Sequence, residues 1–197
     1  AFPFQAENQD MLLYYTTIDA ATEAVAANIL SKYNTSLMNG ADNYQAFLNK
    51  TDPYRAHIKD YTWGSNNTKS KQGNMFLNVP RYSNGLLTWQ QAYEVAIGYA
   101  NYIHGVNPLN FVYLSNMFKH GAKKGVTEFY HTWFAHGSPK WDKVGVSEYG
   151  PAPGFLTGGA NPFYNWDSCC PSGCGSTANN NACKAVDIST VVNQPKQ

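Results

Sequence analysis

The feature that most constrains the fold is one strongly patterned helix, which the sequence predicts over residues 88–104. Thr88 and Gln91 have the spacing of a capping box, in which each side chain bonds the backbone of the other residue. Gly105 stands where many helices end in the left-handed conformation. Small and apolar residues recur every three or four positions and so share one face: Ala92, Val95, Ala96, Tyr99, Ala100 and Ile103. Because many of them are small, this helix can pack closely against its neighbours.

Weaker patterns predict helices before it. Residues 18–33 are expected to form an amphipathic helix with Asp19 at its N-cap. Its apolar face would hold Ile18, Ala21, Val25, Ile29 and Leu30. Shorter helical segments are predicted at 44–48 (one turn at most), at 53–58 (begun by Pro53) and at 69–78 (ended with the help of Pro80). No segment alternates as a half-buried strand does, so the expected fold class is all-α.

Regular periodicity fades from Val106 onward. The stretch of about 106–185 is rich in glycine, proline, asparagine and aromatic residues, and loops of this length are usually functional. The predicted architecture is therefore a helical body with long loops at one end. A chain of 197 residues is enough for one domain with a real core, or for a piece of a larger one.

The composition narrows the classes of ligand. The net charge is +1 and no Lys/Arg run stands out, so nucleic-acid binding has little support. Aromatic residues make up 15% of the chain and charged residues only 14%, a balance that suits a neutral, polyhydroxylated ligand. A large aromatic core explains the same numbers equally well. No stretch approaches the length needed to span a bilayer, so no membrane partner is expected.

The four cysteines lie within fifteen residues of one another, at Cys169, Cys170, Cys174 and Cys183. They form either a local disulfide staple or a zinc clip, and the uncharged, histidine-free surroundings favour disulfides. Adjacent cysteines are not expected to pair with each other, which leaves two connectivities open. Disulfides would place the chain in an oxidising compartment. An export signal would lie upstream, because the first residues lack a basic start and an apolar run.

Four blocks of sequence follow one another in a specific order. They are Tyr61–Asn66 (YTWGSN), Tyr102–Asn116 (YIHGVNPLNFVYLSN), Tyr130–Trp133 (YHTW) and Tyr149–Pro162 (YGPAPGFLTGGANP). Together they resemble the family 9 glycoside hydrolases, the inverting cellulases, and in particular the bacterial cellobiohydrolase-like branch. Ala160 replaces a proline that is usual in the last block. The blocks mark residues 102–162 as the expected sugar-facing region.

The resemblance implies that the chain is part of an (α/α)6 barrel whose loops build an open cleft for a β-glucan polysaccharide. His131 matches the histidine of the family's His-x-Arg motif, which contacts sugar near the cleavage point. Trp133 stands in place of the arginine, so ring stacking would replace one hydrogen bond. Trp63 and Tyr149 are further candidates for sugar contact. Packing alone would also account for these side chains, since tryptophan is more often buried than displayed.

The catalytic carboxylates of this family are not recognisable in the chain. Inverting hydrolysis needs a general base and a general acid. The Asp-x-x-Asp pair that holds the general base in this family is absent. The sequence ends at Gln194–Gln197, and in the similar branch such a segment precedes the glutamate that serves as the general acid. Glu128 and Glu148 match neither motif, and a surface or loop-bracing role is the simpler interpretation. The chemistry needs no cofactor. Family members often bind a structural calcium ion, but no acidic cluster identifies a metal site here.

We therefore expect residues 1–197 to be the later part of the catalytic domain of a secreted β-1,4-glucanase, inactive without the remainder of that domain. Cleft-forming loops would occupy about 106–185. One alternative is a non-catalytic glycan-binding module that keeps a hydrolase-like surface. The other is an unrelated all-α protein in which the order of the blocks is a coincidence.

Overall fold

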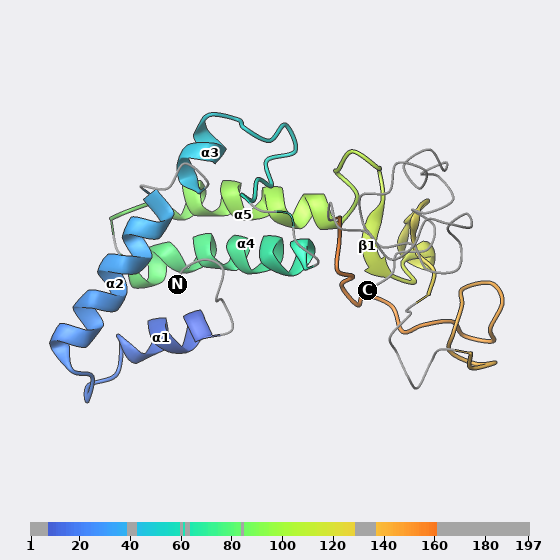
Figure 1. Ribbon diagram of the computed structural model, residues 1–197, viewed down its shortest axis with the longest axis horizontal. Coiled ribbons are helices and arrows are strands. Elements are labelled where there is room, and N and C mark those ends of the chain that lie inside the picture. Colours follow the sequence, from blue (N-terminus) through green and yellow to red (C-terminus); the bar gives the residue numbers. More distant parts are fainter. Residues whose placement is uncertain are drawn as a thin grey trace, which may run out of the picture. The chain divides into compact units, whose positions relative to one another are not determined.

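The computed structural model describes residues 8–38, 43–59, 61, 64–83, 85–128 and 137–160. Its helices are α1 (Gln9–Tyr15), α2 (Glu23–Met38), α3 (Tyr44–Leu48), α4 (Ser65–Tyr82) and α5 (Trp89–Ile103) (Figure 1). The contacts divide the chain into two compact units. The first comprises residues 1–59 and 68–102, and the second comprises residues 60–67 and 103–197. Across the described ranges, no helix is both long enough and apolar enough to cross a membrane.

The strongest helix prediction is confirmed by α5. The Thr88 N–H donates to Gln91 Oε1 at 2.9 Å, and the Gln91 N–H donates to Thr88 Oγ1 at 3.2 Å, which is the reciprocal pattern of a capping box. The residue after the helix, His104, leads into Gly105, which has a φ of +113°. The predicted face is turned inward, and its buried members include Ala92, Val95, Ala96, Tyr99 and Ile103. Local signals therefore determine this element from end to end.

Helix α4 is longer than the predicted segment 69–78 at both ends. Pro80 lies inside the helix rather than after it, because a proline near the C-terminal end costs only one intrahelical hydrogen bond. The chain also stays anchored beyond it. The Ser83 N–H donates to the Val79 carbonyl at 2.8 Å, and Ser83 Oγ donates to Asn34 Oδ1 at 2.5 Å. The helix is thus held past its proline by contacts to α2.

The prediction for residues 18–33 is right about a helix and wrong about its limits and its cap. Helix α2 begins at Glu23, and Thr22, not Asp19, accepts the first helical bonds from Val25 and Ala26 at 3.0 Å. Successive turns occupy residues 16–21, and α1 precedes them as an unpredicted helix. The buried residues of α2, Tyr33 and Leu37, lie in its C-terminal half, while Ile18 and Val25 are exposed.

The short helix predicted at 53–58 is not formed. The Asp52 carboxylate accepts hydrogen bonds from the N–H groups of Tyr54 (2.8 Å) and Ala56 (3.2 Å), and Arg55 takes a φ of +61°. A left-handed residue interrupts helical geometry, so the side chain of Asp52 and the turn it braces override the signal from Pro53. The single turn predicted at 44–48 is confirmed as α3.

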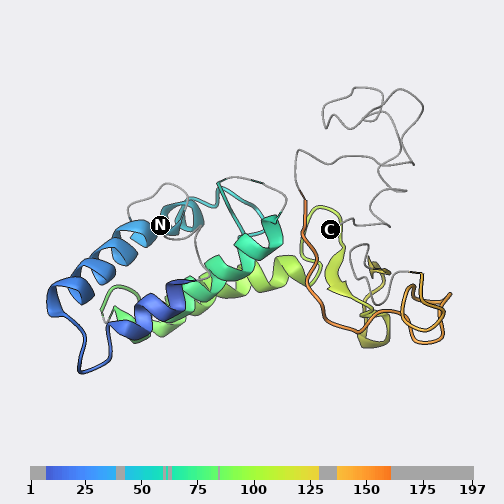
Figure 2. The same cartoon turned by 60° about the horizontal axis from the view of Figure 1, so that its bottom comes forward.

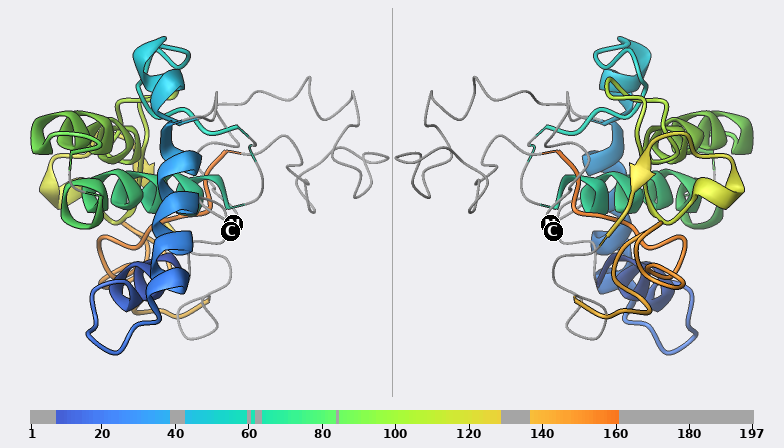
Figure 3. Two further views of the ribbon diagram at one scale, coloured as in Figure 1. Left: turned by 90° about the vertical axis from the view of Figure 1, so that its left-hand side faces the viewer. Right: turned by 90° about the vertical axis from the view of Figure 1, so that its right-hand side faces the viewer.

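Helix α4 is the central element of the first unit. It contacts α1 through Gln9 Nε2, which donates to the Lys71 carbonyl at 3.3 Å (Figure 2). It contacts α2 where Tyr33 Oη donates to the Met75 carbonyl. On another side α4 and α5 run side by side in opposite directions (Figures 1 and 3), and an added Cβ on Gly73 would lie 3.3 Å from Tyr99 Cβ. Gly73 of α4 thus allows close packing against the predicted face of α5.

A buried lysine ties the first unit together. Lys69 is fully buried, and its Nζ donates to the Ala56 carbonyl and lies 4.0 Å from the centre of the Tyr102 ring. Burial lowers the pKa of Lys69 to about 8, and the negative charge of Asp52 partly offsets that effect. The carbonyl and the ring therefore replace water around the ammonium group.

The second unit corrects the expectation that the chain has no strands. Strand β1 (Val112–Ser115) pairs in parallel with the short strand β2 (Gly125–Val126), with an irregular register between them. Isolated antiparallel bridges join Leu114 to Leu156 and Glu128 to Lys143. The described part is still mainly helical, as predicted. The closed helical barrel remains an expectation, as does the assignment of 1–197 to a single domain.

Candidate functional site

The turn after α5 is built around one asparagine. Asn107 is buried, and its Oδ1 accepts hydrogen bonds from the N–H groups of Leu109 (3.1 Å) and Phe111 (3.3 Å). Its Nδ2 donates to the Phe111 carbonyl at 2.8 Å. An asparagine that bonds its own following backbone fixes the local turn. Asn107 of the Gly-Val-Asn-Pro-Leu segment therefore braces β1 at its start.

The end of β1 holds the glycine- and proline-rich loop. Ser115 Oγ donates to the Ala152 carbonyl at 2.6 Å and accepts from the Phe155 N–H at 3.0 Å. The backbone of Ser115 adds two bonds, from its own N–H to the Phe155 carbonyl (2.9 Å) and from the Gly154 N–H to its carbonyl (2.8 Å). Asn116 Nδ2 donates to the Pro151 carbonyl at 2.7 Å. Two adjacent side chains thus fix residues 151–155 against the strand.

The first turn of α4 holds the next part of the same loop. The Asn66 N–H donates to the Gly158 carbonyl at 3.0 Å, and Asn66 Nδ2 donates to the Thr157 carbonyl at 3.1 Å. Gly159 has a φ of +90°, and a Cβ there would lie 2.5 Å from Ser65 Oγ. Only glycine fits both the conformation and the space. Three of the four sequence blocks therefore meet in the second unit, through contacts that span 91 and 93 positions between the first and last blocks and 37 and 44 positions between the second and last.

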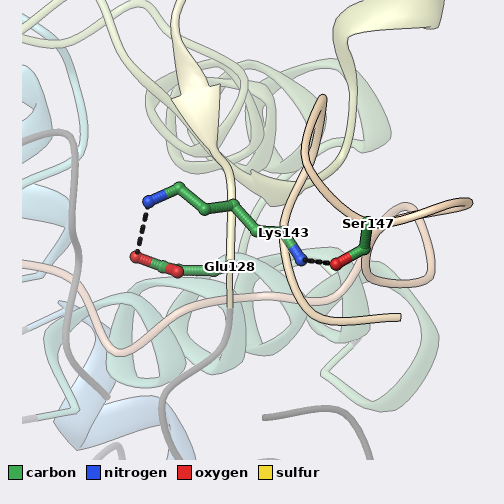
Figure 4. A network of polar contacts seen from close by, with 3 residues as sticks. All are labelled: Glu128, Lys143 and Ser147. Atoms are coloured by element: carbon green, nitrogen blue, oxygen red, sulfur yellow. Dashed lines mark hydrogen bonds and ion pairs between the residues drawn. The ribbon is translucent and has the colours of Figure 1, made fainter. Parts of the chain in front are cut away.

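The segment of residues 137–150 is a second, self-braced loop. Ser138 Oγ accepts from the N–H groups of Lys140 (3.2 Å) and Trp141 (3.3 Å), and the Tyr149 N–H returns to the Lys140 carbonyl at 2.8 Å. Ser147 Oγ accepts from the Lys143 N–H at 3.0 Å (Figure 4). These bonds close the loop on itself.

The loop of residues 137–150 is also tied to residue 128. Lys143 Nζ lies 3.6 Å from Glu128 Oε1, as Figure 4 shows, and the two backbones form an antiparallel bridge. Glu128 therefore braces a loop, which is the interpretation the sequence favoured. Glu148 is exposed and lies next to Tyr149, with which its side chain forms a hydrogen bond.

Two exposed aromatic side chains stack on each other in this loop. The rings of Trp141 and Tyr149 have centroids 4.7 Å apart and planes 30° apart, and 46% and 55% of these residues remain exposed. The hydrogen bond to Glu148 and, secondarily, desolvation raise the pKa of the Tyr149 hydroxyl, which donates its one proton to that carboxylate. The structure therefore displays Tyr149, a predicted sugar-contact residue, on the surface.

Trp141 was not singled out from the sequence. A tryptophan amid glycine, proline and lysine has little apolar sequence around it to bury its ring, and that signal could have identified it as a displayed aromatic. Phe155 is another exposed aromatic residue, 57% accessible, on the loop that Ser115 holds.

The other predicted site residues lie outside the described ranges. These are His131, Trp133, Trp63 and the cysteines Cys169, Cys170, Cys174 and Cys183. Their roles stay predictions. Within the described ranges, no group of three or more His, Cys, Asp or Glu side chains could hold a metal ion.

The chain matches the family model described as glycosyl hydrolase family 9 over residues 4–184. No curated protein and no solved structure matches it. The family match covers both compact units and all four sequence blocks.

Proposed function

Because the chain belongs to glycosyl hydrolase family 9, we propose that it supplies part of the substrate-binding cleft of a secreted enzyme that cleaves β-1,4-glucan with inversion. The observation that carries this proposal is the family match across residues 4–184. The displayed aromatic residues and the small net charge of +1 agree with a neutral polysaccharide substrate.

The residues that would hold the sugar come from the loops. His131 would donate a hydrogen bond to a sugar hydroxyl close to the cleaved bond, and Trp133 would stack on a pyranose face. Trp63 and Tyr149 would extend the same wall. The bracing by Asn107, Ser115 and Asn66 supports this proposal, because a binding loop fixed before the ligand arrives loses less conformational entropy on binding.

Bond cleavage requires two carboxylates set apart by enough space for the attacking water. Glu128 is engaged by Lys143 and Glu148 by Tyr149, so both have bracing roles in this proposal. We therefore expect the general base and the general acid to come from the remainder of the same catalytic domain. The chain alone would bind glucan and leave it intact, which is also how the alternative, a non-catalytic glycan-binding module, would behave.

The test of this function is made on the intact enzyme. Changing His131 to alanine should lower turnover on a soluble cellulose derivative by at least about tenfold, the equivalent of about 1.4 kcal/mol of lost transition-state stabilisation. His120→Ala is the matched control, because His120 is exposed on the described surface. Unchanged kinetics in His131→Ala would remove that residue from the site.

The stereochemical outcome tests the mechanism separately. Proton NMR of the first products should show the α-anomer before mutarotation, because inversion converts a β-linkage into an α-product. Early β-anomer would contradict inversion. An intact enzyme with no activity on any β-glucan would leave the binding-module alternative.

Export and metal content are also proposals. We propose that the four cysteines form two disulfides in an oxidising compartment, and that any calcium ion would brace loops rather than take part in cleavage. Thiol titration of denatured protein should detect no free thiol without reductant and four with it. Four free thiols together with bound zinc would overturn the disulfide proposal and weaken the case for export.

A further inference from the structure

The stacked pair of Trp141 and Tyr149 is displayed at the surface although both side chains are large and apolar. With their centroids 4.7 Å apart, the rings cover one face of each other. About half of each residue still faces solvent, at 46% for Trp141 and 55% for Tyr149. Keeping such rings exposed forgoes about 25 cal/mol for each Å² of apolar surface that burial would remove from water. The pair differs from a single exposed ring such as Trp89 because two adjacent rings form one apolar surface on which a flat ligand can pack.

The backbone holds this pair in place from both ends. Ser138 Oγ receives the N–H of Trp141 at 3.3 Å, and the Lys140 carbonyl receives the N–H of Tyr149 at 2.8 Å. Asn116 Nδ2 reaches the Tyr149 carbonyl at 3.4 Å. The backbone that carries both rings is therefore fixed at both residues. A preorganised aromatic surface binds flat ligands with little entropic cost.

The charges around the pair select the class of ligand. Between residues 138 and 150, Lys140 and Lys143 are balanced by Asp142 and Glu148, so the loop carries no net charge. Lys143 is further engaged by Glu128 at 3.6 Å. An anionic polymer would find no positive cluster, and a cationic one no negative cluster. The surface offers the outer ring face of Trp141 and its indole N–H, which suit the C–H face and the hydroxyls of a neutral pyranose.

We propose that the outer ring face of Trp141, backed by the Tyr149 ring, is a stacking platform for a pyranose ring of a neutral β-glucan. The platform binds the polymer by its flat faces and contributes no group to bond cleavage. The choice of a glucan rests on the proposed function, whereas the ring geometry, the bracing and the absence of net charge stand independently of it. Trp141 is the principal contact because its larger ring offers more surface to stack on.

The first test uses the wild-type chain and needs no variant. Tryptophan oxidation by N-bromosuccinimide is followed by peptide mass spectrometry, with and without hydroxyethylcellulose. We expect the polymer to slow the oxidation of Trp141 at least fivefold. Trp89 is the internal control, because it is 64% exposed on α5 and should oxidise at the same rate in both samples. Equal oxidation of Trp141 with and without polymer would overturn the platform.

The second test measures affinity by electrophoresis through gels that contain hydroxyethylcellulose. Trp141→Ala should raise the dissociation constant at least fivefold, whereas Trp141→Phe, which keeps a ring, should raise it less than threefold. Trp89→Ala serves as the matched control and should bind like the wild type. A purely loop-bracing tryptophan would instead lower the melting temperature of Trp141→Ala with no change in glucan affinity of the folded protein, and that result would overturn the proposal.

The two proposals fail in distinguishable ways. An intact enzyme that cleaves β-glucan while Trp141 stays unprotected would keep the proposed function and remove the platform. Protection of Trp141 in a protein whose intact form cleaves no glucan would keep the platform and remove the hydrolase activity. A panel of β-glucan, carboxymethylcellulose and pectin separates neutral from charged ligands, and stronger protection by either charged polymer would contradict the assignment of a neutral glycan.

Discussion

At the scale of single residues, Lys69 makes the stability of the first unit depend on pH. Burial lowers the pKa of Lys69 to about 8 in the folded chain, against 10.5 for an ordinary lysine. Between these values the unfolded chain binds more protons than the folded one, so the free energy of unfolding rises as the pH rises. Relative to Lys69→Met, the wild type should gain about 1 kcal/mol between pH 7 and pH 9, measured by urea denaturation.

The control for this residue is Lys119→Met, which removes the same charge from an exposed position. Taking the difference between the wild type and each variant cancels the titration of all groups that both proteins share. The contrary result is a difference in free energy of unfolding between the wild type and Lys69→Met that stays constant from pH 7 to pH 9. That result would show that the Ala56 carbonyl and the Tyr102 ring solvate the ammonium group as well as water does.

At the scale of elements, α5 depends on a glycine at its centre. An added Cβ on Gly98 would lie 2.3 Å from the Arg55 carbonyl oxygen, which only glycine allows. Inside an exposed helix, a change from glycine to alanine stabilises by about 1 kcal/mol. Here Gly98→Ala should instead destabilise by about 2 kcal/mol or more, because the turn of residues 52–56 must move away. Gly64→Ala, whose Cβ would meet nothing closer than 3.9 Å, is the control, and equal unfolding midpoints would contradict the close approach.

Elements with local signals could be predicted from the sequence, and elements with distant partners could not. The capping residues and inward face of α5 all lie within its own eighteen-residue segment, 88–105, and the prediction was right. The helix expected at 53–58 failed because the Asp52 carboxylate and the positive φ of Arg55 form a turn there. Strand β1 escaped detection because its partners, at Gly125 and Leu156, contribute only short, isolated pairings.

At the scale of the whole molecule, local sequence motifs identify residues of a candidate site, whereas contacts between distant residues determine how the site is built. The sequence blocks identified the family and marked Tyr149 as a candidate for sugar contact. The sequence could not reveal that Trp141 stacks on Tyr149, because this contact depends on how residues 137–150 close on themselves. It also could not assign roles within the blocks. Ser115, Asn66 and Asn107 turn out to be the residues that hold the loops in shape.

The bond from Asn66 to the Thr157 carbonyl spans 91 residues and fixes one end of the glycine-rich loop. Asn66→Ala leaves that buried carbonyl without its donor, so unfolding should become easier by about 1–3 kcal/mol. The effect should also be local. The Thr157 N–H, which donates to the Tyr113 carbonyl at 3.0 Å, should exchange with deuterium faster, while the buried α5 residue Val95 keeps its protection. Asn74→Ala, at an exposed position of α4, should change neither the free energy of unfolding nor the exchange rate of the Thr157 N–H. Unaltered exchange at Thr157 in Asn66→Ala would mean that Ser115 and β1 hold this loop without α4.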